Sequence, residues 1–165
     1  MPGGPQKDVP LGRNRTGGSD AYTLALTMLS ARELSEAQIR TRLRRREIPD
    51  EEIDSTIARL KADRTIDDRR VARAIGRMES AIRGRGRSRV MQKIRQAGIG
   101  DDIAEDAVRQ VFEEVDEVDL LNRAFERRLR GTDPKDLDDK GRARIIRGLI
   151  AQGFKIDAVL RKLKN

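Results

Sequence analysis

Apolar residues recur along this chain at the spacing of amphipathic helices, and one arrangement of them occurs three times. An apolar residue is followed four positions later by a second, and five positions after that by a third that stands at a turn. The copies are Ile39, Leu43 and Ile48; Val90, Ile94 and Ile99; and Ile145, Leu149 and Phe154, so that successive copies begin 51 and then 55 residues apart. A repeat of this period predicts a row of similar helical units, each stacked on its neighbours.

Caps and breaks around the first copy predict three helices in the first unit. One helix begins at Ser19 or Asp20, and a second follows Ser35, which forms a capping box of the type S-x-x-Q with Gln38. Pro49 is placed to open the third. No alternating strand pattern is present, so the units are expected to be helical throughout.

The second unit reads in the same way. Its first helix is expected to begin at Asp67 and to bury an apolar stripe that extends through Met78 to Ile82. Ser88 is placed to cap the middle helix, which ends at Gly98, a usual helix C-terminal residue.

The third helix of that unit starts at Asp101, and the third unit starts near Asp119. A loop covers 131–139, and the next helix runs to Gly153. The prediction is an all-α fold, an elongated tandem array of three three-helix units whose curvature is left open. The expected divisions are a disordered arm over 1–18, which is rich in glycine and proline, and repeats over 19–66, 67–117 and 118–165.

Composition narrows the chemistry. The 165 residues include no His and no Cys, which excludes Ser-His-Asp and Cys-His catalysis, zinc sites with His or Cys ligands, and disulfides. No apolar run reaches membrane-spanning length and no signal-peptide core is present, so a cytoplasmic protein is expected. Acidic pairs such as Asp67-Asp68, Asp101-Asp102 and Asp138-Asp139 fit a metal-dependent nuclease, but each stands where a helix begins, which favours capping. No cofactor and no enzymatic activity are predicted.

The charge balance favours a polyanionic partner. Lys and Arg number 36 against 28 Asp and Glu, a net charge of +8. Most of the basic residues are Arg, whose planar fork suits phosphate and carboxylate. A GC-rich genome would also supply Arg codons, and composition alone is consistent with either origin.

The densest basic segment is 83–95, which has six basic residues and no acid. Gly84 and Gly86 interleave with its arginines, and a glycine loop that feeds a helix N-terminus offers free backbone amides to phosphate. We predict a phosphate-contacting loop, against the alternative of a solvated flexible linker. The middle helices also have basic residues at corresponding positions of the repeats: Arg89 in the second unit corresponds to Arg144 in the third. The predicted DNA- or filament-binding residues are Arg42, Arg44, Arg45, Arg83, Arg85, Arg87, Arg89, Lys93, Arg95 and Arg144.

The third unit is expected to be a more neutral end piece, because Gly148 and Ile150 replace Lys93 and Arg95. The segment 101–119 is the opposite in charge, with nine acids and one base. Repulsion of DNA and binding of a basic partner are alternatives, but we favour its folding onto the chain's own arginines. Tyr22 and the three Phe residues lie on predicted core faces, so DNA binding would be electrostatic rather than by base stacking. With about four phosphates contacted, log affinity would fall with log salt at a slope of about −3.6.

Several segments together resemble the RecX family of regulators of the RecA recombinase. They are Leu29-Ser30-Ala31-Arg32 with Ser35-Glu36, Ile39-Arg40 and Leu43; Ile66-Asp67-Asp68-Arg69-Arg70-Val71-Ala72; Arg83-Gly84 to Gly98-Ile99; and the closing Gly153-Phe154. The chain departs from the family pattern at Arg64-Thr65, where the family tends to have Gly-Tyr, at Val71, which replaces a usual Phe, and at Glu47-Ile48, which lacks the usual Gly.

The resemblance implies a non-enzymatic protein that lodges in the groove of the RecA–DNA filament and restrains recombinase and coprotease activity, with a role in homologous recombination, DNA repair and the SOS response. Its partners would be the RecA filament and, weakly and in a salt-dependent way, single- and double-stranded DNA, and it would be a monomer with no membrane partner. The alternatives are a free-standing DNA-binding protein without sequence specificity and a helical scaffold without RecA involvement.

Overall fold

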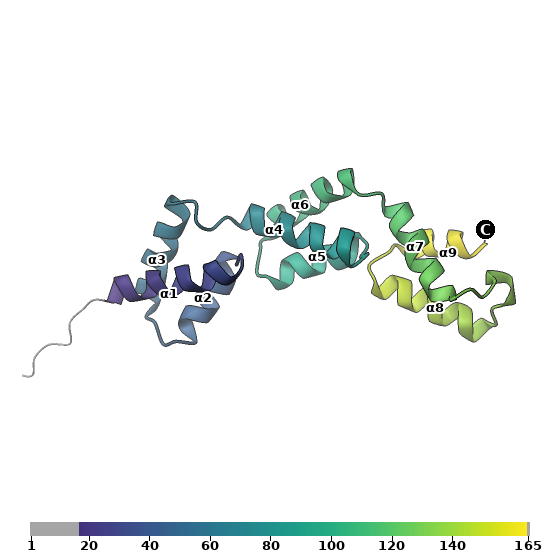
Figure 1. Cartoon of the computed structure of the whole chain (residues 1–165), viewed down its shortest axis with the longest axis horizontal. Helices are drawn as coiled ribbons and strands as arrows, with labels where there is room; N and C mark the ends of the chain where they lie inside the picture. The colour runs from purple at the N-terminus through teal and green to yellow at the C-terminus, as the bar shows by residue number, and fades with distance from the viewer. Residues whose placement is uncertain (1–16, 165) are drawn as a thin grey trace, which may run out of the picture.

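The computed structural model describes residues 17–164, and over this range the chain is all-helical, as predicted (Figure 1). A π-helical turn, η1 (Met78–Ile82), follows the fourth helix, and a 3-10 turn, η2 (Pro134–Asp136), precedes the eighth. The α-helices are α1 (Gly17–Ala31), α2 (Glu36–Arg44), α3 (Asp50–Ala62), α4 (Asp68–Arg77), α5 (Arg87–Gln96), α6 (Asp101–Glu114), α7 (Glu117–Leu129), α8 (Asp139–Ala151) and α9 (Ile156–Lys164).

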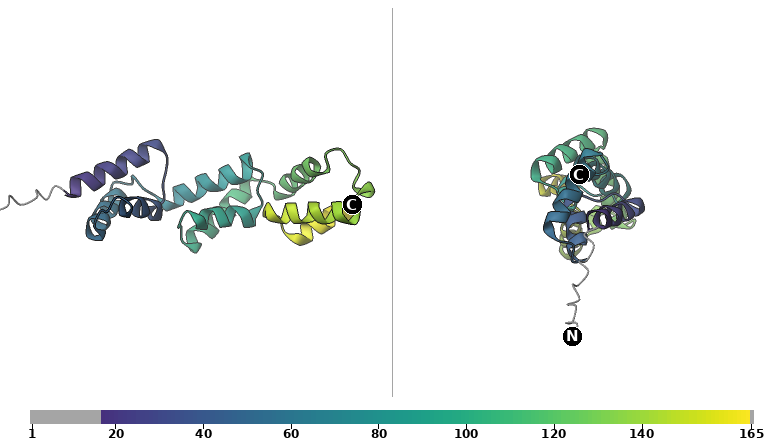
Figure 2. Two further views of the ribbon diagram at one scale, coloured as in Figure 1. Left: turned by 90° about the horizontal axis from the view of Figure 1, so that it is seen from below. Right: turned by 90° about the vertical axis from the view of Figure 1, so that its left-hand side faces the viewer.

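The helices form three groups along the long axis of the molecule: α1–α3, α4–α6 and α7–α9 (Figures 1 and 2). The division into repeats at 19–66, 67–117 and 118–165 stays a prediction, which these groups follow in order. The predicted arm lies outside the described residues from 1 to 16. Its last two residues, Gly17 and Gly18, belong to α1 instead.

The predicted caps are mostly confirmed. Ser35 forms the capping box with Gln38, and Asp67 accepts hydrogen bonds from two backbone N–H groups at the start of α4. Asp138 caps α8, and Asp101 opens α6. The acidic pairs therefore act at helix N-termini, and in the part of the chain that the structure describes no three acidic side chains gather into a metal-binding group.

The predicted repeat corresponds to one recurring helix end. The residue before its third apolar position has a left-handed backbone in each copy: Glu47 at φ 59°, Gly98 at φ 76° and Gly153 at φ 96°. In two copies the next N–H reaches back five residues, from Ile48 to Leu43 and from Phe154 to Leu149, each at 3.3 Å. The five-residue interval in the sequence is thus the interval of a Schellman-type cap.

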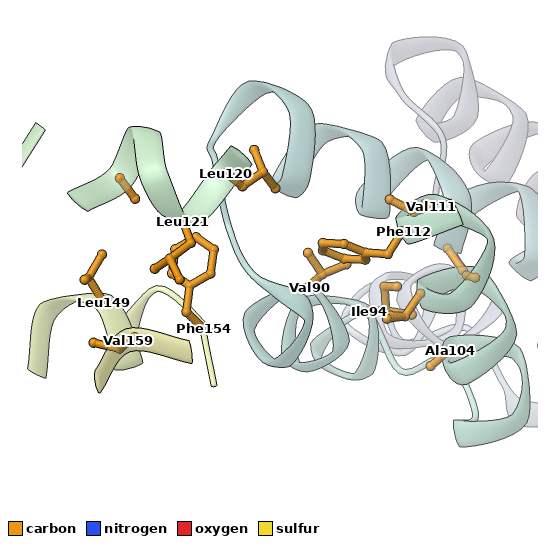
Figure 3. Close-up of a cluster of buried hydrophobic side chains, with 14 of the residues drawn as sticks. Val90, Ile94, Ala104, Val111, Phe112, Leu120, Leu121, Leu149, Phe154 and Val159 are labelled. Atoms are coloured by element: carbon orange, nitrogen blue, oxygen red, sulfur yellow. The ribbon is translucent and has the colours of Figure 1, made fainter. Parts of the chain in front are cut away.

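The apolar core is divided into two parts. One cluster lies within α1–α3 and the segment after α3, and is built around Ile39, Leu43 and Leu60. The other is continuous through the second and third groups, from Val71 to Val159, and Figure 3 shows part of it. The second and third groups therefore share apolar packing, whereas the first group has a core of its own.

Some predicted core positions are wrong. Met78 is 47% exposed and Ile82 is 74% exposed, because the α-helical period ends at Arg77 and the wider π-helical turn rotates the stripe away from the core. Glu79 and Ser80 are buried in their place. The three Phe residues are buried as predicted, but Tyr22 is only half-buried.

Candidate nucleic-acid interface

The predicted phosphate loop is held by the protein itself. The backbone N–H groups of its residues all donate within the chain: Gly84 to Ser80, Arg85 to Glu79, Gly86 to Gln152, Arg87 to the Glu117 carboxylate and Ser88 to Gly153. The expectation of free amide donors is therefore wrong. Ser88 is also not the cap of α5, because the helix begins at Arg87 and its N-cap residue is Gly86.

The glycines of this loop permit close packing. A Cβ on Gly86 would lie 2.5 Å from the carbonyl oxygen of Gly153, and one on Gly84 would lie 2.9 Å from the Arg127 guanidinium. Neither separation is tolerated in a folded protein without a shift of the neighbour. The glycines therefore allow the second helix group to pack closely against the third.

Half of the basic side chains in 83–95 are paired with acids. Arg83 bonds to the buried Glu79 at 2.9 Å, Arg87 to Glu117 at 3.0 Å and Arg95 to Asp101 at 2.7 Å. The Arg87 guanidinium also lies over the Phe112 ring, 4.7 Å from its centroid. These arginines have a structural role in addition to any contact with a polyanion.

The other three, Arg85, Arg89 and Lys93, are half-buried and have no ion pair with the described residues. The Nε atoms of Arg85 and Arg89 are buried without a hydrogen-bond partner. Lys93 lies on α5 in register with Arg42 of α2, which also has no ion pair within residues 17–164. Together with the exposed Arg45 and Arg144, these four are the predicted site residues that form no ion pair with the described residues.

On α2 the pairing is again selective. Arg44 bonds to Asp50 at 2.8 Å, Arg45 is exposed, and Arg40 bonds to Glu36 and Asp54. Burial of Glu36 raises the pKa of its carboxyl, but hydrogen bonds from Lys61 and Arg40 outweigh it, so that the pKa lies below its usual value. The hydrogen bonds to Asp54 and Glu36 in turn raise the pKa of Arg40.

The middle helices of the three groups meet end to end. The Ser35 hydroxyl, at the start of α2, donates to the carbonyl of Ala97 at the end of α5. The N–H of Gly86, at the start of α5, donates to the carbonyl of Gln152 at the end of α8, at 2.9 Å. Ser35 and Gly86 are matching positions of the repeat, as are Ala97 and Gln152, so the same junction occurs twice. It places the uncompensated Arg42, Arg89 and Lys93 on successive helices of one stack.

The third group contributes arginines that the sequence pattern did not single out. The predicted Arg144 of α8 lines a pocket of about 250 Å³ together with Arg127, Arg128 and Arg130 from the end of α7. The Arg128 guanidinium lies against Gly148 and donates to its carbonyl at 3.0 Å. Gly148 stands where α5 has Lys93, so a cation from α7 occupies the position that the helix itself leaves empty. A glycine inside a helix was the sequence signal for this, because it usually marks a close approach.

The acidic segment folds largely onto the chain's own arginines, as we favoured. Its ion pairs join Asp101 to Arg95, Asp106 to Arg69 and Arg109, Glu114 to Arg77, Glu117 to Arg87 and Asp119 to Arg123. Asp116 caps α7. These pairs neutralise much of the segment's negative charge, and two of them do so at Arg87 and Arg95 of α5 itself.

Comparison with known proteins identifies the family. A curated relative, the regulatory protein RecX of Syntrophotalea carbinolica, is 32% identical over 136 residues, which covers 82% of this chain and 89% of the relative. This chain belongs to the RecX family. The regulatory protein RecX of Pseudomonas putida is 28% identical over 158 residues, 96% of this chain and 93% of the relative.

The structural likeness agrees with this assignment. The family model for RecX, first three-helix domain, matches residues 21–60, which cover most of α1, all of α2 and most of α3. The crystal structure of RecX from Lactobacillus salivarius superposes with a TM-score of 0.77 and 23% identity, covering 90% of this chain and 97% of the other, which shows the same fold. The family resemblance drawn from the sequence is confirmed. As a RecX-family member, the chain belongs with regulatory proteins, and none of the helices over residues 17–164 is long and apolar enough to cross a bilayer.

Two departures from the RecX pattern have a structural consequence. Glu47 and Arg64 stand where the family tends to have glycine, and both have left-handed backbones, at φ 59° and 54°. A side chain in this region costs about 1–2 kcal/mol relative to glycine. At both positions the fold of the family is kept, but the backbone is locally strained.

Proposed function

We propose that this protein binds the RecA–DNA filament and inhibits the recombinase and coprotease activities of RecA. The membership of the RecX family supports the partner, and the elongated form of the molecule supports binding along a filament (Figure 1). The single observation that carries the proposal is the stack of middle helices α8, α5 and α2 with the uncompensated Arg42, Arg89 and Lys93 along it. Such a surface fits the phosphates of a nucleic acid held inside a protein groove.

The proposed contact is mainly electrostatic. The Phe rings are buried, and the Tyr22 ring lies under the Arg59 guanidinium, 3.8 Å from the ring centroid, while its hydroxyl donates to Asp63 at 3.0 Å. No free aromatic face is therefore offered to bases by the described residues. Binding is expected to depend on salt and to show little sequence preference.

The deciding experiment measures ATP turnover and strand exchange by RecA on single-stranded DNA with and without the protein. We expect both rates to fall as the protein approaches filament sites in concentration. Unchanged rates at several-fold excess would contradict the proposal. Salt-dependent DNA binding without any effect on RecA would instead support a free-standing DNA-binding protein, which the same basic surface would also serve.

We further propose that the protein acts as a cytoplasmic monomer built of three repeats, with boundaries near residues 66 and 117. Light scattering of the purified protein tests the monomer, and limited proteolysis tests the boundaries. Cleavage first at the 62–67 connection is expected, because the first group has its own apolar core.

A further inference from the structure

The strongest unassigned feature of the molecule is the arginine pocket between α7 and α8. Arg127, Arg128, Arg130 and Arg144 line it, and the remaining lining residue is Ile145. No carboxylate of residues 17–164 forms an ion pair with any of the four guanidinium groups. Four cations in a small pocket repel one another unless an anion or solvent compensates them.

The pocket is supported as a built structure by Arg128. Its guanidinium lies against Gly148, its Nη2 donates to the Gly148 carbonyl at 3.0 Å, and its Nε is buried without a partner. A glycine inside a helix costs about 1 kcal/mol relative to alanine. At Gly148 the missing side chain leaves room for Arg128, because any Cβ there would overlap the Arg128 guanidinium.

A second feature of the pocket is the backbone of Arg130. This residue ends α7 in the left-handed conformation, at φ 52° and ψ 34°, although the next residue is a glycine. A left-handed residue is a common helix end, as at Glu47 and Arg64, and here it sets where the Arg130 side chain leaves α7.

The location of the pocket indicates its ligand. Arg127 reaches from α7 to Gly84 of the loop before α5, so the pocket borders the basic segment 83–95. Arg144 is the repeat equivalent of Arg89, and Arg128 occupies the place of Lys93. The pocket therefore continues the row of uncompensated cations on α2 and α5 into the third group. Its lining has no aromatic side chain that could stack on a base.

We propose that this pocket binds one phosphodiester group of a nucleic-acid strand that runs along the stacked middle helices. The proposal rests on the proposed function, of which it specifies a third contact. It also changes the expectation that the third unit is more neutral. Gly148 replaces Lys93 on α8, but Arg128 of α7 places a positive charge at that position.

The test is the salt dependence of binding to a fluorescent oligothymidylate, measured by anisotropy with the full-length protein. In the variant R127Q/R130Q/R144Q, we expect the slope of log affinity against log salt to become shallower by about 0.7, the share of one single-strand phosphate. The control R69Q/R109Q/R123Q loses the same charge from arginines that already pair with acids, and it is expected to keep the wild-type slope.

A second variant changes no charge. Gly148→Ala displaces the Arg128 guanidinium while improving the helix propensity of α8, so circular dichroism is expected to show unchanged or greater helicity. We expect its oligothymidylate affinity to fall and its slope to become shallower, like that of the triple variant. The proposal is wrong if both variants keep the wild-type salt slope, or if the charge control R69Q/R109Q/R123Q shows the same change in slope as the triple variant.

The remaining outcomes distinguish a phosphodiester site from a site for a small anion, and the pocket from the filament function. If pyrophosphate raises the melting temperature of the wild type but not of the triple variant, and the oligothymidylate slopes are equal, the pocket takes a small phosphate ligand and the proposal is wrong. If RecA responds to the protein while all slopes are equal, the filament function stands without the pocket. If the slopes change as expected and RecA does not respond, the pocket stands and the filament function is wrong.

Discussion

Gly86 donates its backbone N–H to the carbonyl of Gln152 at 2.9 Å, and this bond joins the start of α5 to the end of α8. The matching junction between α2 and α5 uses the Ser35 hydroxyl in place of a backbone N–H. The positive N-terminal end of one helix dipole thus faces the negative C-terminal end of another at both junctions, which is favourable. The repeat therefore specifies the contact between the units as well as the fold of each.

Replacement of Gly86 by alanine is expected to lower the free energy of unfolding by about 2 kcal/mol, because the new Cβ would lie 2.5 Å from the Gly153 carbonyl oxygen. Urea denaturation measures this. Gly100→Ala is the matched control, since Gly100 is also an extended N-cap glycine and its nearest neighbour is a flexible Asp102 oxygen at 3.1 Å. Equal losses in the two variants would show that the cap, and not the junction, is responsible.

Glu47→Gly is expected to stabilise the protein by about 1 kcal/mol, because Glu47 holds a left-handed backbone at φ 59° that glycine adopts without strain. Thermal unfolding and urea denaturation both measure the gain. Glu47→Ala removes the same side chain but keeps the Cβ, so no comparable gain is expected from it. A gain of the same size in both variants would assign the effect to the Glu47 charge.

Stability is expected to decrease in acid partly through Glu36. Its folded-state pKa is lowered, so its ionised form contributes stability above the unfolded-state pKa, near 4.5, and that contribution is lost as pH falls through the folded-state value. The measurement is the free energy of unfolding of the wild type and of Glu36→Gln from neutral pH to below 4.5. The difference between them is expected to be largest near neutral pH and to shrink in acid. A constant difference would mean that the Lys61 and Arg40 contacts do not depend on the charge of Glu36.

The basic segment is expected to divide into two functional classes. Neutralising the unpaired set should weaken oligothymidylate binding and make its salt slope shallower, whereas neutralising the paired set should mainly lower the free energy of unfolding, because Glu79 and Glu117 lose their partners. Both sets remove three positive charges. The unpaired set is R85Q/R89Q/K93Q and the paired set is R83Q/R87Q/R95Q. Identical binding curves for the two sets would contradict this division.

Sequence reasoning succeeded where the information is local. The capping box at Ser35, the caps at Asp67 and Asp138 and the apolar positions of the repeat all follow from spacing within one turn or one helix. The prediction was wrong at Ile82, where a π-helical turn that itself contains neither glycine nor proline shifts the helical period.

The candidate site was predictable in part, for a different reason. The cations on α2 and α5 lie on regular helix positions, so a helical wheel finds them. The contact of Arg128 with Gly148 joins residues 20 positions apart on different helices, and the bonds from Gly86 and Ser88 to the end of α8 span still more. Such long-range contacts leave only indirect marks in a sequence, such as an unexpected glycine.

The end-to-end junction of the middle helices is a head-to-tail contact, and contacts of this kind can in principle extend without limit into fibres. At both free ends of the row the local residues differ from those of the two junctions. At the α2 end Glu47 replaces the glycine that at position 98 admits Ala37, and at the α8 end the helix begins at Asp139, two residues before Gly141, the equivalent of the junction residue Gly86. Neither free end therefore carries the residues of the two junctions, and the row of middle helices ends at α2 and at α8.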